Sequence, residues 1–256
     1  MKSSPLVEYQ KLSPNHSGKR THEIDTITPH CVVGQLTVES IGNIFSKASA
    51  KASSNYGIGK DGKIGLFVVE GNRSWCSSNR DNDQRAVTIE CASDIDAPYA
   101  MSDKVYNRLI DLCVDICARY NKTKLIWLGD KTKTMLYQEH QKQGEMVLTV
   151  HRWFANKSCP GDWLYSRLGD LAKTVTDRLS EDQPATEVDD FTPYQVRINI
   201  TNLRIRSGPG TNHENKGHIM PGVYTIVAES TGEGAPLWGK LKSGAGWVAL
   251  EYTTKI

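Results

Sequence analysis

The chain has 256 residues, of which 38% are hydrophobic and 23% are charged, and this balance is typical of a folded globular protein. Its 31 basic and 29 acidic residues leave a net charge of +2, which gives no argument for nucleic-acid binding. No apolar run reaches the ~18 residues of a membrane-spanning helix, and residues 1–8 lack the apolar core of a secretory signal. We therefore expect a protein that is made in the cytoplasm and that neither binds nucleic acid nor inserts into a membrane.

The six cysteines are too sparse in a chain of this length to form a disulfide scaffold. Cys113 and Cys117 lie four residues apart in a helical pattern, so we expect both thiols to pack on one buried face. No CxxC pair occurs, which argues against a zinc site made of four cysteines.

A change in composition marks a domain boundary. Residues 181–190 contain five acidic residues, no basic residue and one proline, as expected of a solvated linker. This predicts two domains, residues 1–180 and residues 191–256.

The first domain begins with alternating strand and helix signals. Ile24 and Ile27, with β-branched threonines around them, predict a strand that ends at Pro29 and His30. Thr37 is expected to cap a helix. The apolar stripe of that helix comprises Val38, Ile41, Ile44 and Phe45.

The alternation continues to the end of the first domain and predicts an α/β fold, with a mixed sheet flanked by helices. Ser102 is expected to cap a long helix, whose inward face holds Val105, Leu109, Ile110, Cys113, Ile116 and Cys117. The other expected elements are two strands within 56–69 around the Asp61-Gly62 turn, a strand over 85–91, a buried strand over 124–128, and a helix over 162–179 opened by Pro160.

The second domain has a different pattern. Val196, Ile198 and Ile200 alternate with polar residues, and three further short apolar segments follow, separated by glycine turns such as 207–210. This pattern predicts a small all-β barrel.

Two residues with metal-binding chemistry lie eight positions apart, His151 and Cys159. Imidazole nitrogen and thiolate sulfur are both good zinc ligands, and His30 at a strand end could supply a third. Three protein ligands would leave one position open to water, as a catalytic zinc site requires. Spacing alone favours the other interpretation, a surface histidine and a buried cysteine.

Glu90 and Lys157 are the further candidates. Glu90 alternates with Val87 and Ile89 on a predicted strand, and a carboxylate there is costly to bury unless it is paired or functional. It could serve as general base for a water molecule, or it could simply face solvent. The ammonium of Lys157 could stabilise a developing oxyanion, or it could be an ordinary exposed lysine.

Residues 22–179 resemble the zinc-dependent N-acetylmuramoyl-L-alanine amidases of the type-2 amidase family. This family includes many phage endolysins and is related to the peptidoglycan recognition proteins. The likeness is carried, in chain order, by four blocks: 27–30 (ITPH), 53–64 (SSNYGIGKDGKI), 87–91 (VTIEC) and 151–161, which ends in KSCPG.

The resemblance implies that His30, His151 and Cys159 bind zinc, that Glu90 is the general base, and that Lys157 stabilises the tetrahedral intermediate. The chain departs from many relatives in three places: Cys31 and Asn55 stand where they have histidine, and Ser54 stands where some have a catalytic tyrosine. Two aromatic residues are candidates either for the substrate groove or for the core, namely Tyr56 and Trp75.

The second domain resembles the bacterial SH3-like modules that bind cell walls. Residues 202–210 (NLRIRSGPG) match the opening signature, and 238–241 and 246–248 match later strands. The residues that would contact the wall cannot be deduced from this signature, which consists mainly of turn residues.

The resemblance implies a zinc-dependent peptidoglycan hydrolase that cleaves the amide bond between N-acetylmuramic acid and L-alanine of the stem peptide. A missing export signal fits an endolysin that reaches the bacterial wall after release. The alternatives are a bacterial autolysin of prophage origin and a non-catalytic peptidoglycan-binding protein. A protein that binds proline-rich peptides through its SH3-like domain is a third interpretation.

Overall fold

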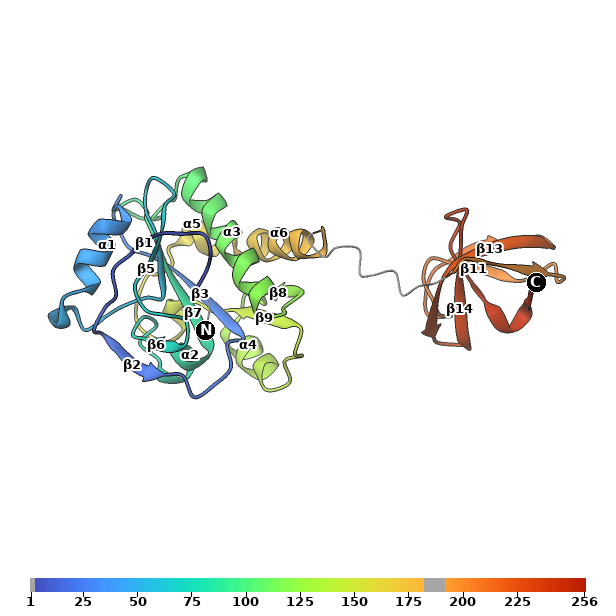
Figure 1. Cartoon of the computed structure of the whole chain (residues 1–256), viewed down its shortest axis with the longest axis horizontal. Coiled ribbons are helices and arrows are strands. Elements are labelled where there is room, and N and C mark those ends of the chain that lie inside the picture. The colour runs from blue at the N-terminus through green and yellow to red at the C-terminus, as the bar shows by residue number, and fades with distance from the viewer. Residues whose placement is uncertain (1–2, 182–191) are drawn as a thin grey trace. The chain divides into compact units, whose positions relative to one another are not determined.

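The computed structural model describes residues 3–181 and 192–256. The chain divides into two compact units, Met1–Gln183 and Pro184–Ile256, and each has its own hydrophobic core (Figure 1). Residues 182–190 of the predicted linker lie outside the described residues. Within the described residues, no helix combines the length and apolar character needed to span a membrane.

A seven-stranded mixed sheet forms the centre of the first unit. Its strands are parallel to their neighbours except for one antiparallel pair, β4–β5. Across the sheet the order is β1 (Val7–Gln10), β5 (Ile64–Leu66), β4 (Tyr56–Ile58), β7 (Ala86–Cys91), β3 (Thr26–Cys31), β9 (Glu145–Leu148) and β8 (Lys124–Ile126). Two further strands, β2 (His16–Lys19) and β6 (Asn72–Ser74), pair separately.

Helices cover the sheet on both sides, and Figure 1 shows α1 (Val38–Phe45) on one side and α3 (Asp103–Arg119) with α6 (Leu168–Glu181) on the other. Helix α1 packs its apolar stripe against Phe67 in a small separate cluster. Helices α3 and α6 pack together over the main core. The shorter helices are α2 (Arg80–Arg85), α4 (Lys131–Gln138) and α5 (Asp162–Tyr165), and the 3-10 turns are η1 (Ala48–Ala50) and η2 (His151–Trp153).

The helix starts follow the capping residues predicted from the sequence. The side chains of Thr37 and Ser102 each accept a hydrogen bond from the backbone three residues later, at the starts of α1 and α3. The predicted inward face of α3 is buried throughout, including the thiols of Cys113 and Cys117. The α/β class of the first unit is thus confirmed.

Three local predictions were wrong. Ile44 is 44% exposed, because α1 turns Gly42 toward the sheet in its place. The strand expected to be buried at 124–128 is the edge strand β8, in which only Leu125 is buried. The helix expected over 162–179 is divided into α5 and α6.

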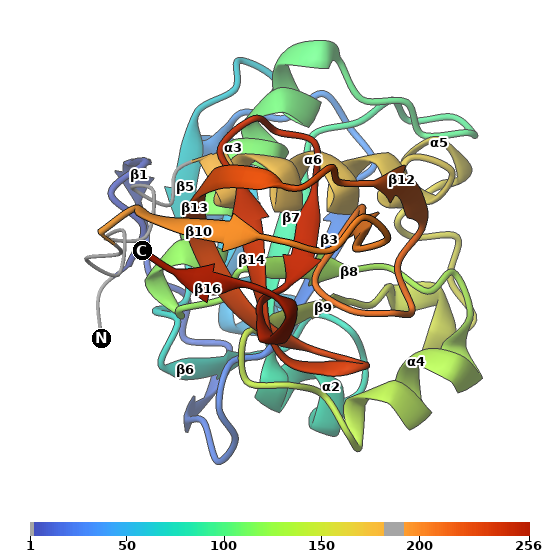
Figure 2. The same cartoon turned by 90° about the vertical axis from the view of Figure 1, so that its right-hand side faces the viewer.

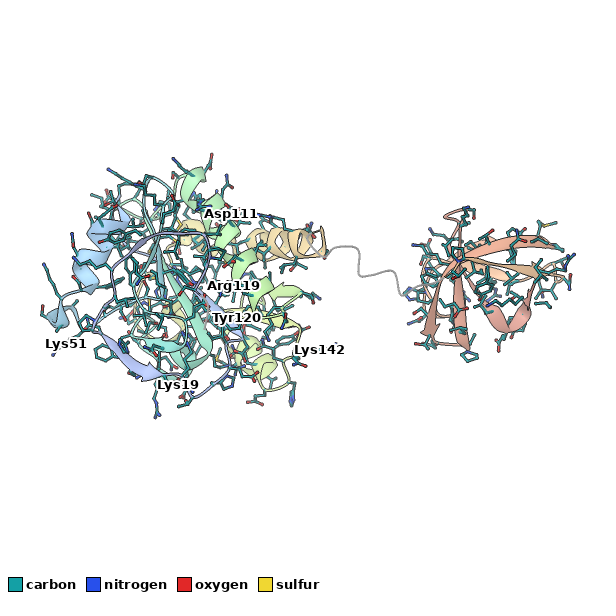
Figure 3. All side chains as sticks on the ribbon, viewed as in Figure 1. Lys19, Lys51, Asp111, Arg119, Tyr120 and Lys142 are labelled. Carbon is teal, nitrogen blue, oxygen red and sulfur yellow. The ribbon has the colours of Figure 1, made fainter. Side chains whose placement is uncertain are left out.

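A buried carboxylate, Glu70, joins the sheet to the end of α3. It is 1% exposed and accepts hydrogen bonds from the hydroxyls of Tyr56 (2.6 Å) and Tyr120 (2.8 Å). Both terminal nitrogens of the Arg119 guanidinium also donate to it, at 2.8 and 2.6 Å, and Arg119 and Tyr120 lie side by side in Figure 3. A charged group this deep is tolerated because every oxygen lone pair has a donor.

Replacing Glu70 with glutamine is expected to lower the free energy of unfolding of the first unit by about 3 kcal/mol, since it breaks the buried ion pair with Arg119 and leaves that guanidinium its ion pair with Asp115. Urea unfolding followed by helical circular dichroism measures this, because all α-helices of the described residues lie in the first unit. Glu8→Gln is the control: Glu8 pairs with Arg108 at the surface, and such pairs contribute about 1 kcal/mol or less. Equal losses in the two variants would contradict a structural role for the buried cluster.

The second unit is all-β, as predicted. Figure 2 shows β16 beside β10, in agreement with the pairing of these strands at one end of a seven-stranded antiparallel sheet. The order is β12 (Asn215–His218), β11 (Arg204–Arg206), β15 (Trp247–Ala249), β14 (Ala235–Leu241), β13 (Gly222–Gly232), β10 (Tyr194–Ile198) and β16 (Thr254–Lys255). The outer strands β12 and β16 do not pair with each other among the described residues, so the predicted closed barrel is not seen.

Candidate metal centre

The site is built on the register of two neighbouring parallel strands, β3 and β7. His30 of β3 lies directly opposite Glu90 of β7, one residue before the end of each strand. Paired residues of adjacent strands point to the same face of a sheet, so the two side chains are held together by the backbone itself. The imidazole Nδ1 of His30 lies 4.0 Å from Oε1 of Glu90.

The segment that follows β9 brings in the other two residues. His151 begins the 3-10 turn η2, and its ring centroid lies 5.1 Å from that of His30. Sγ of Cys159 lies 3.2 Å from Nδ1 of His30, although the two residues are 129 positions apart in the chain. The ligand atoms of His30, His151 and Cys159 all lie within 4.8 Å of one another.

Polar contacts beneath the site hold these segments in place. Asn82 of α2 donates to Thr28 of β3 at 3.1 Å and accepts from Thr149 at 2.8 Å, and the two threonine hydroxyls are 2.7 Å apart. All three side chains are buried, so each hydrogen bond restrains its segment strongly. The hydroxyl of Ser78 lies 3.0 Å from Nε2 of His151 and fixes the orientation of that ring.

Burial keeps both imidazoles in the form that can bind a metal. Burial, together with a smaller effect of the neighbouring His151, lowers the pKa of His30 to about 3. Burial also lowers the pKa of His151, with a smaller contribution from the positive charge of Lys157. Both rings are therefore neutral near pH 7, the protonation state of a metal ligand.

The thiol of Cys159 is in an environment that does not favour its ionisation. A hydrogen bond with the side chain of Cys31 and burial both raise its pKa well above the usual value for a thiol. A thiolate at this position therefore requires a positive charge beside it, which a bound metal ion would supply.

Glu90 has few polar contacts. The Cys76 thiol donates to its Oε1 at 3.8 Å, while Oε2 is buried without a hydrogen-bond partner among the described residues. Burial raises the pKa of Glu90 to about 7, and the contact with Cys76 opposes this rise. A carboxylate whose pKa lies near neutrality can both accept and return a proton.

A cavity of about 470 Å³ opens onto Glu90 and His151, and Lys157 lies on its wall. Three further cationic side chains line it, namely Lys51, Arg73 and Arg80. Lys51, labelled in Figure 3, follows η1 and has a left-handed backbone conformation. The cavity therefore presents four cationic side chains around two carboxylates, Glu90 and Asp83.

All five candidate site residues thus lie in or beside one centre, but four neighbours had no signal in the sequence. Three of them come from loops and one from β6, and their spacing carries no motif: Lys51, Cys76 and Ser78 in the loops, and Arg73 in the strand. The ligand atoms of His30, Cys76 and Glu90 also lie within 4.8 Å of one another, so the geometry contains a second possible metal group.

Cys31, Ser54 and Asn55 do not line the cavity, although the side chain of Cys31 contacts that of Cys159. Asn55 and Ser54 are buried and hydrogen-bonded to the backbone, and Tyr56 is fully buried against Glu70. Tyr56 therefore belongs to the core. Trp75, which is 36% exposed, does line the cavity.

Comparison with known sequences identifies the first unit. Residues 20–162, more than half of the chain, match the family described as N-acetylmuramoyl-L-alanine amidase (Amidase_2). The chain belongs to this amidase family. The match contains all five candidate residues, and the expected enzyme class, an N-acetylmuramoyl-L-alanine amidase, is confirmed at the level of the family. No curated protein matches the chain.

Solved structures of amidases and endolysins resemble the first unit only weakly. The structure of PlyL is 15% identical, covering 65% of this chain and 95% of PlyL, with a TM-score of 0.47. The structure of Staphylococcus aureus hydrolase AmiA in complex with its ligand is 12% identical. The match covers 70% of this chain and 85% of AmiA, with a TM-score of 0.48. A mutant endolysin from Bacillus subtilis is 15% identical. The match covers 66% of this chain and 99% of the endolysin, with a TM-score of 0.42. The assignment of the amidase family therefore rests on the sequence match.

Proposed function

We propose that the protein is a zinc-dependent amidase that hydrolyses the bond between the lactyl group of N-acetylmuramic acid and L-alanine. The observation that carries this proposal is the grouping of His30, His151 and Cys159 next to Glu90, within a segment that matches the amidase family. Two imidazoles and one thiolate form a common donor set of catalytic zinc and leave a position for water.

The spacing of the donors fits a zinc ion. Zinc–nitrogen and zinc–sulfur bonds of about 2.0–2.3 Å at tetrahedral angles separate neighbouring ligand atoms by roughly 3.3–3.6 Å. Sγ of Cys159 and Nδ1 of His30 are already 3.2 Å apart. The ligand atom of His151 lies within 4.8 Å of each of the other two ligand atoms. Small side-chain rotations therefore suffice. Zinc held there would polarise the amide carbonyl and acidify a water molecule.

The residues of the chain then have separate tasks. Glu90 accepts a proton from the attacking water and afterwards donates it to the alanine nitrogen, as the C–N bond breaks. Lys157, on the wall of the same cavity, places its ammonium where negative charge develops on the carbonyl oxygen.

Mass spectrometry of purified cell walls digested by the protein tests this function. We expect stem peptides with a free N-terminal L-alanine and glycan strands that keep intact lactyl groups. Release of peptides cleaved within the stem, or of glycan fragments, would contradict amidase specificity.

We further propose that the protein acts as an endolysin and that the second unit is an SH3-like module that holds the amidase at the wall. The two units have separate cores, and the signature at 202–210 supports a wall-binding module. Tethering raises the concentration of enzyme at an insoluble substrate but not in free solution.

Truncation after residue 182 is therefore expected to weaken wall binding at least tenfold while cleavage of a soluble muropeptide changes less than threefold. Co-sedimentation with walls and a chromatographic muropeptide assay measure the two effects on the full and truncated chains. An equal loss in both assays would mean that residues 191–256 support the amidase fold directly.

A further inference from the structure

A cavity of about 440 Å³ lies within the second unit, and no step of the proposed reaction uses it. It is formed by residues of β11, β12, β14, β15 and the 3-10 turn η3 (Leu250–Tyr252) together with neighbouring loops. Its apolar lining includes Leu203, Trp238 and Ala249, which are buried, and Ile200 and Tyr252, which are 37% and 54% exposed. We call the three buried side chains, Leu203, Trp238 and Ala249, the apolar floor of the cavity, and the two partly exposed ones, Ile200 and Tyr252, its rim.

Two buried donors on the wall of this cavity lack acceptors. Nε1 of Trp238 and Nε of Arg206 have no hydrogen-bond partner, and they are the only such buried side-chain atoms in the described part of the second unit. Trp238 is only 3% exposed. Indole and guanidinium groups can only donate, so both atoms require an acceptor that the fold does not provide.

The charge of the cavity is positive. Arg204 and Arg206 contribute two permanent charges, and the imidazole of His218 lies beside them on the lining. Arg206 keeps one donor engaged with the backbone oxygen of His213 at 3.0 Å, which anchors its guanidinium at the wall. Two acidic groups contact lining residues, since Glu233 accepts a hydrogen bond from Thr211 and Glu251 accepts one from Tyr252, but neither carboxylate lines the cavity itself.

We propose that this cavity binds a short acidic peptide, and specifically the carboxylate-bearing stem peptide of the wall. This inference rests on the proposed function and names the ligand of its wall-binding unit. A peptide carboxylate pairs with Arg204 and Arg206, a main-chain carbonyl accepts from the indole of Trp238, and alanine methyl groups contact the apolar floor.

The shape and lining favour a peptide over an anionic phosphate polymer of the wall. A polymer of glycerol phosphate gains from positive charge, but its polar glycerol units have no methyl groups to contact the apolar side chains of Leu203, Trp238 and Ala249. A peptide can pair with the arginine charges, accept hydrogen bonds from the two unsatisfied donors and contact the apolar floor at the same time. The cavity is also small enough to enclose only a few residues.

Nuclear magnetic resonance on the full chain tests the proposal at the residues themselves. The probe is the synthetic tetrapeptide L-alanyl-γ-D-glutamyl-L-lysyl-D-alanine, added to protein in which the indole signal of Trp238 has been assigned with Trp238→Phe. We expect a saturable shift of the Trp238 Nε1–H and Arg206 Nε–H signals. The same peptide with its carboxylates amidated is expected to bind at least tenfold more weakly.

A matched pair of variants distinguishes a specific contact in the cavity from a nonspecific effect of the net positive charge. Arg206→Gln removes a cavity cation, and Arg197→Gln removes an exposed arginine of β10 that does not line the cavity. We expect Arg206→Gln to weaken tetrapeptide binding about tenfold and Arg197→Gln to change it less than twofold. The backbone spectrum of each variant reports whether the fold is retained.

Three results would overturn the inference: no shift of the Trp238 signal at saturating peptide, equal weakening by the two variants, or shifts caused by oligomeric glycerol phosphate and not by the tetrapeptide. The last result would assign the cavity to a wall phosphate polymer. If walls are cleaved but the signals do not move, only this inference fails. If the signals move but walls are not cleaved, the proposed amidase function fails.

Discussion

Replacing Glu90 with glutamine is expected to reduce hydrolysis of cell walls by about 10²–10⁴-fold, the usual contribution of a general acid–base group. Glutamine has nearly the same shape and can still accept the weak contact from Cys76, but it cannot take a proton from water. We therefore expect zinc content and thermal stability to remain near wild-type values. Release of free L-alanine termini, elemental analysis and circular dichroism measure the three quantities.

Glu23→Gln is a suitable control for this experiment, because Glu23 is exposed and does not line the cavity beside Glu90. It should hydrolyse walls at the wild-type rate. Near-normal hydrolysis by Glu90→Gln would show that Glu90 is structural and that another group acts as the base.

The double variant His151→Ala, Cys159→Ala is expected to lose bound zinc and all measurable amidase activity, since one imidazole alone does not hold the ion tightly. Cys76→Ala distinguishes the two overlapping groups around His30. If zinc is bound by His30, His151 and Cys159, the Cys76 variant retains one zinc per chain. Elemental analysis of dialysed protein gives the stoichiometry directly.

Full zinc occupancy in the double variant would reject the proposed ligands. Loss of zinc in Cys76→Ala together with retention in the double variant would assign the metal to His30, Cys76 and Glu90 instead. In that case Glu90 would be a ligand and could not also serve as the free base.

Local signals in the sequence predicted the elements that carry the site. The β-branched run before His30, the alternation around Glu90 and the caps at Thr37 and Ser102 each depend on neighbouring residues only, and the structure contains all of them. The candidate residues depended on a family pattern rather than on spacing, because His30 and Cys159 approach each other across 129 positions.

The rest of the site depends on tertiary contacts that leave no local pattern. Cys76 reaches Glu90 only because β6 ends beside the cavity, and the burial of Glu70 depends on a helix end, Arg119 and Tyr120, far along the chain. The edge position of β8 likewise follows from the order of strands and not from its apolar residues.

The pairing of His30 with Glu90 links the chemistry of the site to the assembly of the sheet. Shifting β3 by one residue against β7 would place Pro29 or Cys31 opposite Glu90 and turn the imidazole to the other face. Cys159 joins the site only after a contact of very long sequence separation has formed, and such contacts form slowly. The time course of metal uptake during refolding would therefore record when the chain reaches its native strand register.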